Sequence, residues 1–387
     1  MKIINKIILF GQFGPAFLAF ARICTAKGIA PYLLEVTDKK TNCRRYSSCL
    51  AGGASIHPKY IGCQEGIDSI NNYIEHIEAQ ALIAQDDIII LWLGKNLLRL
   101  PAHCKFLAPP ADKLEPLLSK KTQLGLAERA ELRVLPTWYI SNMDEGKLIP
   151  EDSYPICLRP AQSGAISPSF KAMVCKTPAQ LFAFTSSLHF LGPPIIVQSF
   201  KLLPNLVVHG VRSEDGSILS LKTFLVPRKF EGLSLTLEPI TLHDDFLNQC
   251  IIFANLANCI GPFHLDFLFS KEKKEAYFLE VNIRLGGTTD KVLRLNFNEP
   301  SLTLAAYGLT GPKETTDIAN SCKRVVNKRA VLKHMLYSLR NNVSELDYPQ
   351  LSNTNHFFTS LKDFLFTSDS VFDWHDIKGT TWYHFKI

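Results

Sequence analysis

The chain has 387 residues, of which 46% are hydrophobic and 20% are charged, and its formal net charge is +6. This composition excludes a disordered or collagen-like chain, and the length predicts roughly two to four domains. The positive excess is spread along the chain without a run of like charges, which argues against nucleic acid as a partner.

The ten cysteines show no C-x-x-C pair and no regular spacing. We interpret them as free thiols in a reducing compartment. No apolar run is long enough for a transmembrane helix, and the first one is interrupted by the turn Gly11–Gly14, where a secretory signal needs a continuous helix. We therefore expect a cytoplasmic protein without a membrane partner.

The N-terminal part of the chain has the pattern of a doubly wound α/β domain. Lys6–Phe10 and Pro31–Val36 predict two strands joined by a turn and a helix, which is a βαβ unit with a parallel sheet, and Asp87–Leu93 predicts a further buried strand. The turn Gly11–Gly14 lacks the G-x-G-x-x-G fingerprint, so we interpret it as a tight turn and not as a dinucleotide site. Residues 1–112 form this domain.

Beyond the proline-rich linker at residues 107–112, the pattern changes to short antiparallel strands, which is typical of an α+β fold. Helices are expected at residues 117–130, 243–257 and 323–340, and we interpret the last as a core-packed helix with a solvated basic face. Strands are expected at Ile156–Leu158, Ala172–Cys175, Ile195–Phe200, Leu206–Arg212, Ile218–Val226, Leu235–Ile240, Phe263–Phe269 and Glu275–Val281. The predicted domain boundaries are 113–195, 196–312 and 313–387.

The last two of these strands predict a hairpin with a metal site. Glu280 and Asn282 share one strand face, while Leu279, Val281 and Ile283 point into the core. A hairpin that closes at residues 271–274 brings Asp266 opposite Glu280 and Asn282. Two carboxylates and an amide oxygen suit Mg²⁺, which prefers a few protein oxygens together with phosphate oxygens. The alternative is a solvated strand face without a ligand.

The string Leu279–Gly287, with the sequence LEVNIRLGG, resembles the metal-binding motif of ATP-grasp enzymes, in the form found in carboxylate–amine ligases related to carbamoyl-phosphate synthetase. The resemblance extends from the N-terminus to about residue 312. It implies an α/β protein with an N-terminal doubly wound domain, a two-lobed ATP-grasp core and a C-terminal extension. It also implies that Asp266, Glu280 and Asn282 hold Mg²⁺ on the phosphates of ATP, and that Arg284 faces phosphate.

The same resemblance assigns further residues to the nucleotide. Lys121 matches a family lysine that precedes a "vPxT" segment, with the adjacent Lys120 as the alternative. Arg159 stands where the family has a lysine, and a fork of guanidinium donors binds phosphate differently from an ammonium. The loop after Arg159 has a single glycine, Gly164, where the family usually has several. Gln198 and Phe200 lie in the linker that grips adenine.

Three other groups of residues have side chains suited to chemistry. The loop at residues 226–234 resembles the basic loop that faces the acceptor, so Arg228 or Lys229 meets a carboxylate or acyl-phosphate there, unless both are ordinary surface charges. His264 is a packed strand histidine or a proton shuttle next to Asp266. The acidic and histidine side chains around Trp374 suggest tail packing rather than a metal site.

The resulting hypothesis is an ATP-dependent ligase that joins a small-molecule carboxylate to an amine through an acyl-phosphate, with Arg159, Arg284 and Arg228 as catalytic groups. The alternative is a decayed ATP-grasp protein that acts as a nucleotide-binding regulatory or scaffolding module, which the arginine at position 159 permits. A homodimer is left open as the oligomeric state.

Overall fold

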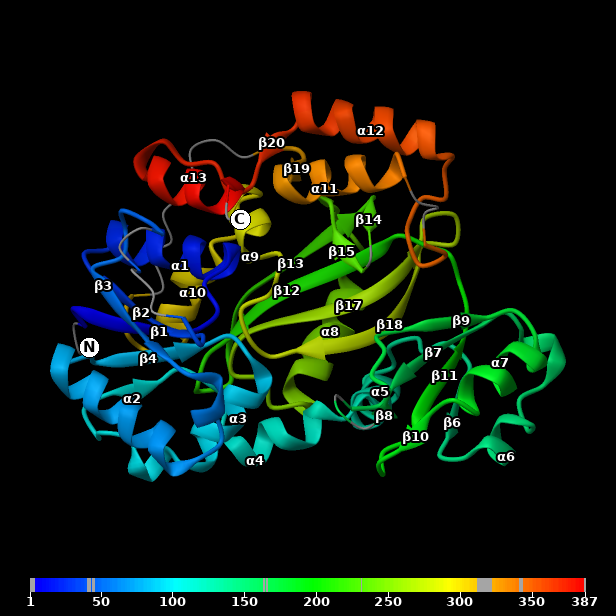
Figure 1. Ribbon diagram of the computed structural model, residues 1–387, viewed down its shortest axis with the longest axis horizontal. Helices are drawn as coiled ribbons and strands as arrows, with labels where there is room; N and C mark the ends of the chain where they lie inside the picture. The colour runs from blue at the N-terminus through cyan, green and yellow to red at the C-terminus, as the bar shows by residue number, and fades with distance from the viewer. Residues whose placement is uncertain are drawn as a thin grey trace.

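The computed structural model describes residues 4–39, 43, 46–162, 164, 166–230, 232–311, 322–340 and 344–385. Its larger sheets have five, four and seven strands. Figure 1 shows the five-stranded sheet beside the central seven-stranded sheet, the four-stranded sheet on the far side, and the C-terminal helices above. All ten cysteines are free thiols. None of the helices in the described ranges is long and apolar enough to cross a bilayer.

The N-terminal sheet is parallel and doubly wound, as predicted, with the strand order β3-β2-β1-β4-β5. The strands are β1 (Lys6–Gly11), β2 (Ala30–Val36), β3 (Gly52–Ile56), β4 (Ala81–Ala84) and β5 (Lys105–Phe106), and the helices are α1 (Pro15–Ala26), α2 (Gln64–Ile77), α3 (Asp87–Lys95) and α4 (Ala111–Leu114). The strand order reverses between β1 and β4. Ligands of such sheets bind at the carboxyl ends of the strands beside this point, where α1 and α3 begin.

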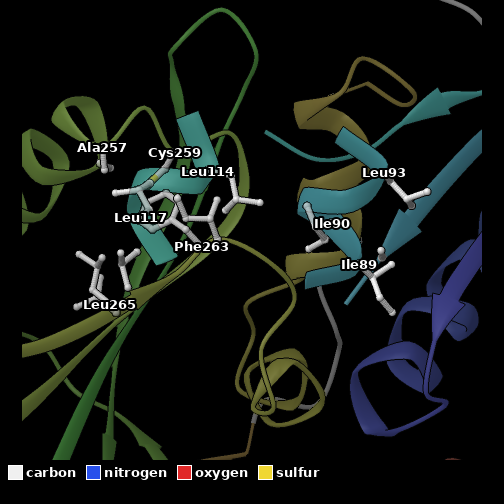
Figure 2. Close-up of a cluster of buried hydrophobic side chains, with 14 of the residues drawn as sticks. Ile89, Ile90, Leu93, Leu114, Leu117, Ala257, Cys259, Phe263 and Leu265 are labelled. Atoms are coloured by element: carbon white, nitrogen blue, oxygen red, sulfur yellow. The ribbon is translucent and has the colours of Figure 1, made fainter. Parts of the chain in front are cut away.

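The expected strand at Asp87–Leu93 is wrong, because this segment is helix α3. A short run of apolar residues fits a buried strand and a buried helix equally well, since neither has a polar face. The helix is set by Asp86, whose side chain accepts hydrogen bonds from the backbone N–H groups of Ile88 and Ile89 at 2.9 and 3.2 Å. Figure 2 shows Ile89, Ile90 and Leu93 on this helix, within the same buried cluster as Leu117 and Phe263.

The central sheet is antiparallel except at its β19–β20 edge and has the order β18-β17-β12-β13-β16-β19-β20. Its strands are β12 (Asn205–Arg212), β13 (Ile218–Val226), β16 (Thr236–Pro239), β17 (Gly261–Ser270), β18 (Glu275–Asn282), β19 (Val325–Val326) and β20 (Ser368–Asp369), and its helices are α5 (Lys120–Arg129), α8 (Asp244–Leu256), α9 (Thr289–Arg294) and α10 (Glu299–Ala306). Helix α8 packs on the sheet through Phe253, whose ring lies 5.0 Å from that of Phe278. Helix α5 packs against β18.

The four-stranded sheet forms a small lobe with its own core. It contains β6 (Thr137–Ile140), β7 (Ile156–Pro160), β9 (Met173–Cys175) and β11 (Ile195–Ser199), with α6 (Met143–Gly146), α7 (Pro178–Thr185) and the strand pair β8 (Ile166–Ser167) and β10 (His189–Phe190). Buried Ile156, Leu158 and Val197 alternate with residues that face away from this core. Arg159 is one of those outward residues and faces the central sheet.

The C-terminal part covers one end of the central sheet with α11 (Lys328–Ser338), α12 (Asn353–Phe366) and α13 (Ile377–Phe385). The helix expected from Lys323 begins only at Lys328, because Val325 and Val326 pair with β16 and Asn327 caps the helix by accepting from the backbone N–H of Ala330.

The tail returns to the N-terminal domain through Asp376, which is 1% exposed and accepts hydrogen bonds from Arg22 Nε at 3.0 Å and Ser47 Oγ at 2.7 Å. The tail packs on the N-terminal domain, but Trp374 itself is 77% exposed, and the aromatic contact comes from Trp382, whose ring lies 4.6 Å from that of Tyr46.

Candidate active site

The β17–β18 hairpin has the predicted register, with Asp266 opposite Glu280 and His264 opposite Asn282. A β-bulge follows Asp266, because Phe267 pairs with Phe278 and leaves Leu279 without an opposite residue. The bulge reverses the alternation of the strand. Leu279 is consequently half-buried instead of pointing into the core as expected, and Glu280 faces the same side as Asp266.

The carboxylates of this hairpin repel each other in the absence of a cation. Burial and the charge of Glu280 raise the pKa of Asp266 to about 8. Asn282 Nδ2 donates to Asp266 Oδ2 at 3.4 Å, and Arg284 Nη2 donates to Asn282 Oδ1 at 3.4 Å, so three oxygen-bearing side chains converge on one face. A divalent cation among them would relieve the repulsion.

Lys120 is the lysine that lies at this hairpin. Its Nζ is 2.7 Å from Glu280 Oε2. Helix α5 holds it there because Gln123, one turn further on, accepts from Val281 N at 2.9 Å and donates to Val281 O at 3.2 Å. Lys121 points elsewhere and lies 5.0 Å from the centre of the Tyr139 ring. Of the two lysines left open by the sequence, the structure therefore favours Lys120.

Arg159 approaches the same carboxylate from the small lobe, with its Nη1 3.9 Å from Glu280 Oε2. Burial acts to raise the pKa of Glu280, but Lys120 and Arg159 together outweigh it and the pKa is lowered. Arg159 Nη2 donates to Gln198 Oε1 at 2.7 Å and to the carbonyl of Leu279 at 3.4 Å. These hydrogen bonds fix the position of the guanidinium.

The two residues predicted for the adenine linker are engaged by protein groups. Gln198 is 3% exposed, and besides accepting from Arg159 it donates to Thr137 Oγ1 at 3.0 Å. The backbone N–H of Phe200 donates to Pro155 O at 2.8 Å. A contact of either residue with adenine stays a prediction. Gly164 adopts a positive φ of 76°, whereas its neighbours at 163 and 165 lie outside the described residues.

Arg284 ties the hairpin to the N-terminal domain. Its Nε lies 2.9 Å from Asp87 Oδ1, at the start of α3. This contact brings the carboxyl edge of the parallel sheet to the hairpin. No feature of the sequence indicates that Asp87 lies at the site, because the sequence predicts a buried strand for this segment. The guanidinium of Arg284 lies next to Asn282, and its expected contact with phosphate stays a prediction.

Arg228 is not at the site, which corrects its predicted catalytic role. Its side chain is 4% exposed, pairs with Asp363 and donates to Ser360 Oγ at 2.8 Å, so it is directed into α12. Successive residues of an extended segment point to opposite sides. Lys229, the alternative, therefore faces the site side and donates to Asn205 Oδ1 at 2.9 Å. Its neighbour at 231 lies outside the described residues.

His264 is a packed histidine next to the carboxylates. Its ring stacks on that of His209 at 5.5 Å, and His209 is held by Glu299 at 2.7 Å and by Thr288 at 2.8 Å. Its Nε2 lies 3.8 Å from Asp266 Oδ2. Burial, followed by the charges of His209 and Arg284, lowers the pKa of His264 well below its usual value. A neutral ring in this position favours the packing interpretation over the proton shuttle.

Two cavities flank the hairpin. The smaller, of about 170 Å³, lies between α3, α5 and β18 and includes Asp87, Lys120 and Asn282. The larger, of about 390 Å³, lies on the other side of Asp266. Its lining comes from α1, the central sheet, β14 (Lys229–Phe230), β15 (Leu233–Ser234), α9, α11 and α13: Pro15, Asn205, Val207, Val226, Lys229, Gly232, Leu233, Ser234, His264, Asp266, Gly287, Thr288, Lys291, Asn327, Ala330 and Tyr383.

No family model and no curated protein matches the sequence. Solved structures do match. One is the biotin carboxylase domain of a 2-oxoglutarate carboxylase from Hydrogenobacter thermophilus, in complex with MgADP, ADP and bicarbonate, which is 12% identical with a TM-score of 0.64 over 80% of this chain and 70% of that chain. An ADP complex of an N5-carboxyaminoimidazole ribonucleotide synthetase is 12% identical with a TM-score of 0.64 over 88% and 86%. An L-amino acid ligase from Bacillus licheniformis is 12% identical with a TM-score of 0.60 over 82% and 79%.

These neighbours are ATP-grasp enzymes. The chain has the ATP-grasp fold. In this fold, Arg159 comes from the small lobe, Lys120 from α5, and the acidic pair from the central sheet. Positive and negative side chains therefore meet where the small lobe adjoins the central sheet.

The donor set fits Mg²⁺ better than a softer metal. Among the residues that the structure describes, no group of three His, Cys, Asp or Glu side chains is arranged to hold a metal ion. A cation at the hairpin would therefore be held by Asp266, Glu280 and the amide oxygen of Asn282, with the remaining positions filled by water or phosphate. Mg²⁺ favours such partial oxygen coordination.

Proposed function

We propose that this protein is an ATP-dependent ligase that joins a carboxylate to an amine through an acyl-phosphate and releases ADP and phosphate. The observation that carries the proposal is the meeting of Asp266 and Glu280 with Lys120 and Arg159 across the lobes. A triphosphate needs a metal ion on its oxygens and fixed cations on its outer phosphate, and this arrangement offers both kinds of group.

In the first step, a carboxylate oxygen of the substrate attacks the γ-phosphorus, and the bond to the β–γ bridging oxygen breaks to release ADP. Asp266, Glu280 and Asn282 would hold Mg²⁺, which neutralises phosphate charge. Lys120 and Arg159 leave Glu280 and contact the γ-phosphoryl oxygens instead. Their positive charges then stabilise the negative charge of the transition state.

In the second step, the amine nitrogen attacks the acyl carbon, phosphate departs, and the nitrogen loses a proton to phosphate or solvent. The small lobe, which carries Arg159, shields the acyl-phosphate from water. Arg284 keeps Asn282 in place through its contact with Asn282 Oδ1 and anchors the hairpin to Asp87.

The test is a screen for ADP formation with Mg²⁺, ATP and a panel of carboxylates and amines, with products identified by mass. Lys120→Met and Lys121→Met provide a matched pair in the same turn of α5. We expect Lys120→Met to lose ADP formation by about a hundredfold, the size of a single electrostatic group, and Lys121→Met to keep most of it. Equal activity in both variants would contradict the role of Lys120.

A nucleotide-binding module without turnover is the second candidate. This candidate is favoured by Arg159, which replaces the family lysine and whose Nη2 donates a hydrogen bond to Gln198 Oε1. Tight binding of Mg-ATP without ADP formation over the whole panel would support this candidate. We further propose a cytoplasmic location, because all ten cysteines are free thiols. A homodimer, the state of the matched biotin carboxylase domain, is the proposed assembly, which the molar mass in solution tests.

A further inference from the structure

The larger cavity beside Asp266 contains a lysine without a counter-charge. Lys291, in α9, is 4% exposed and lines this cavity. Within the described ranges, its Nζ makes no hydrogen bond or ion pair, whereas other buried charges of the chain, such as Arg228 with Asp363, are paired. Burying an unpaired ammonium is costly, and the cost is recovered when an anion binds to it.

A second cation faces the same cavity from another wall. Lys229 lines it from β14, with its Nζ held by the side-chain oxygen of Asn205. Among the described residues of the lining, Asp266 is the one acidic side chain, and the proposed function assigns it to the metal. In the described lining, two lysines therefore face the single carboxylate of Asp266, and Asp347, which acts on the charge of Lys229, lies outside this lining.

The start of α1 adds to this positive character. Pro15 lines the cavity, and α1 has neither a side-chain cap at Gly14 nor an acidic residue in its first turn. The positive end of the helix dipole therefore lacks an anion from the protein. Lys291, which is unpaired and buried at the same cavity, is the independent feature that points to a ligand.

We propose that the carboxylate substrate is a dianion, whose second anionic group binds between Lys291 and Lys229 while its reacting carboxylate faces the hairpin. This inference rests on the proposed function and specifies its substrate class. A volume of about 390 Å³ is at the small end for ligand sites, which suits a short dicarboxylate or a short carboxylate with a phosphate-type group. Lys291 is then a specificity-determining residue that acts on the far end of the substrate.

Three probes of equal chain length separate these ligands: butyrate, succinate and 3-phosphonopropionate. Thermal unfolding of the full chain is measured with each probe, and ADP formation is measured with Mg-ATP and a mixture of amines. Succinate or 3-phosphonopropionate should raise the melting temperature, and the stronger of the two identifies the second group as carboxylate or phosphate-type. Butyrate should have little effect. Lys291→Met should weaken binding of the dianion by about tenfold or more, which corresponds to the loss of one charged hydrogen bond. The binding of butyrate should not change.

Two further variants serve as controls for the charge of Lys291 and for the loss of an unrelated lysine. Lys291→Arg keeps the charge and should restore most of the binding, which a purely structural role would not require. Lys147→Met removes an exposed lysine of the small lobe that pairs with Asp144, and should leave binding unchanged. Ligand-free Lys291→Met should melt no lower than the parent, because it loses an unpaired buried charge.

The outcomes distinguish the inference from the proposed function. If the dianions bind through Lys291 but no ADP forms, the dianion-binding site stands and the ligase proposal fails, so the dianion is a ligand and not a substrate. If ADP forms equally well with butyrate and succinate, and Lys291→Met changes neither reaction, the ligase proposal stands and the dianion inference is overturned.

Discussion

Asp266→Asn is the substitution that separates a metal ligand from a structural carboxylate. Opposite side chains of an antiparallel pair lie about 5 Å apart, at which two ionised carboxylates repel by roughly 3 kcal/mol at an effective dielectric constant of about 20. Lys120 and Arg159 beside Glu280 make this an upper bound, which applies where Asp266 is ionised. Asparagine keeps the shape of the side chain and removes this repulsion. The ligand-free variant should therefore be at least as stable as the parent.

The pH dependence of this difference has a definite sign. The folded-state pKa of Asp266 is raised to about 8, so the parent loses stability as the pH rises from the unfolded value of about 4 to about 8. Asparagine does not titrate. The melting temperature of Asp266→Asn relative to the parent should accordingly increase with pH over this window and level off above it.

Mg-ATP should reverse the order of the two proteins. At about 100 times its dissociation constant, a ligand stabilises the parent by about 2.7 kcal/mol. With an unfolding entropy of about 2.1 cal/mol/K per residue, this corresponds to a rise of about 3 °C for a chain of 387 residues. The variant should lose most of this rise.

The assay is differential scanning fluorimetry at about pH 6 and about pH 9, with and without Mg-ATP. Asp152→Asn, which changes an exposed carboxylate of the small lobe, is the control and should behave as the parent. The reasoning is refuted if Asp266→Asn melts well below the parent at both pH values and still shows the full rise with Mg-ATP.

Three further predictions concern the surroundings of the hairpin. Gly286→Ala would place its Cβ 2.8 Å from the ring of His264, which is stacked on His209, so we expect the unfolding free energy to fall by about 1–3 kcal/mol. Gly287→Ala is the control and should be near neutral, because no atom lies within 4 Å of its added Cβ. Equal denaturation midpoints for the two variants would contradict this packing. Arg228→Met removes the nearer cationic partner of the buried Asp363 and leaves Arg324 Nη1 at 3.8 Å, so stability should fall by about 3 kcal/mol or less while the folded fraction keeps its ADP formation. A loss of turnover in fully folded protein would return Arg228 to the site. Burial lowers the pKa of Lys229 to about 8 against the opposing effects of Asp347 and Cys157, so its positive charge is lost as the pH rises through about 8; binding of succinate, followed by calorimetry, should weaken above that pH in the parent and change less in Lys229→Arg.

The hairpin was predictable because it depends on local rules. Alternation placed Glu280 and Asn282 on one face, and the charged turn fixed Asp266 opposite Glu280, as the structure confirms, while His264 lies opposite Asn282. The bulge at Leu279 was not predictable, since it depends on how Phe267 and Phe278 pack across the strands. A bulge leaves no mark in the pattern of apolar residues.

Other differences between the predicted and the observed site arise where either of two neighbouring residues could have faced the site. Lys120 and Lys121 are equivalent in sequence, and only the packing of Gln123 against Val281 turns Lys120 to the site. Arg228 and Lys229 are separated in the same way by the position of α12. Helix α3 lacked a polar face that would have revealed it.

Lys291 had no signal in the sequence at all. It follows the glycine pair of the hairpin motif by a few residues and looks like an exposed helix lysine. Its surroundings come from segments far apart in the chain, because α1 packs against α9, and residues of α11 and α13 line the same cavity as Lys291. The burial of a residue by segments distant in the chain cannot be predicted from the local sequence pattern.

The most direct test of acyl-phosphate formation is the fate of a carboxylate oxygen. The protein is incubated with Mg-ATP, an amine mixture and carboxylates, succinate among them, whose carboxyl groups carry ¹⁸O, and the inorganic phosphate is analysed by mass. Attack of the carboxylate on the γ-phosphorus predicts that one ¹⁸O atom appears in phosphate for each amide formed, together with ADP. Unlabelled phosphate alongside amide, or release of AMP and pyrophosphate, would contradict it.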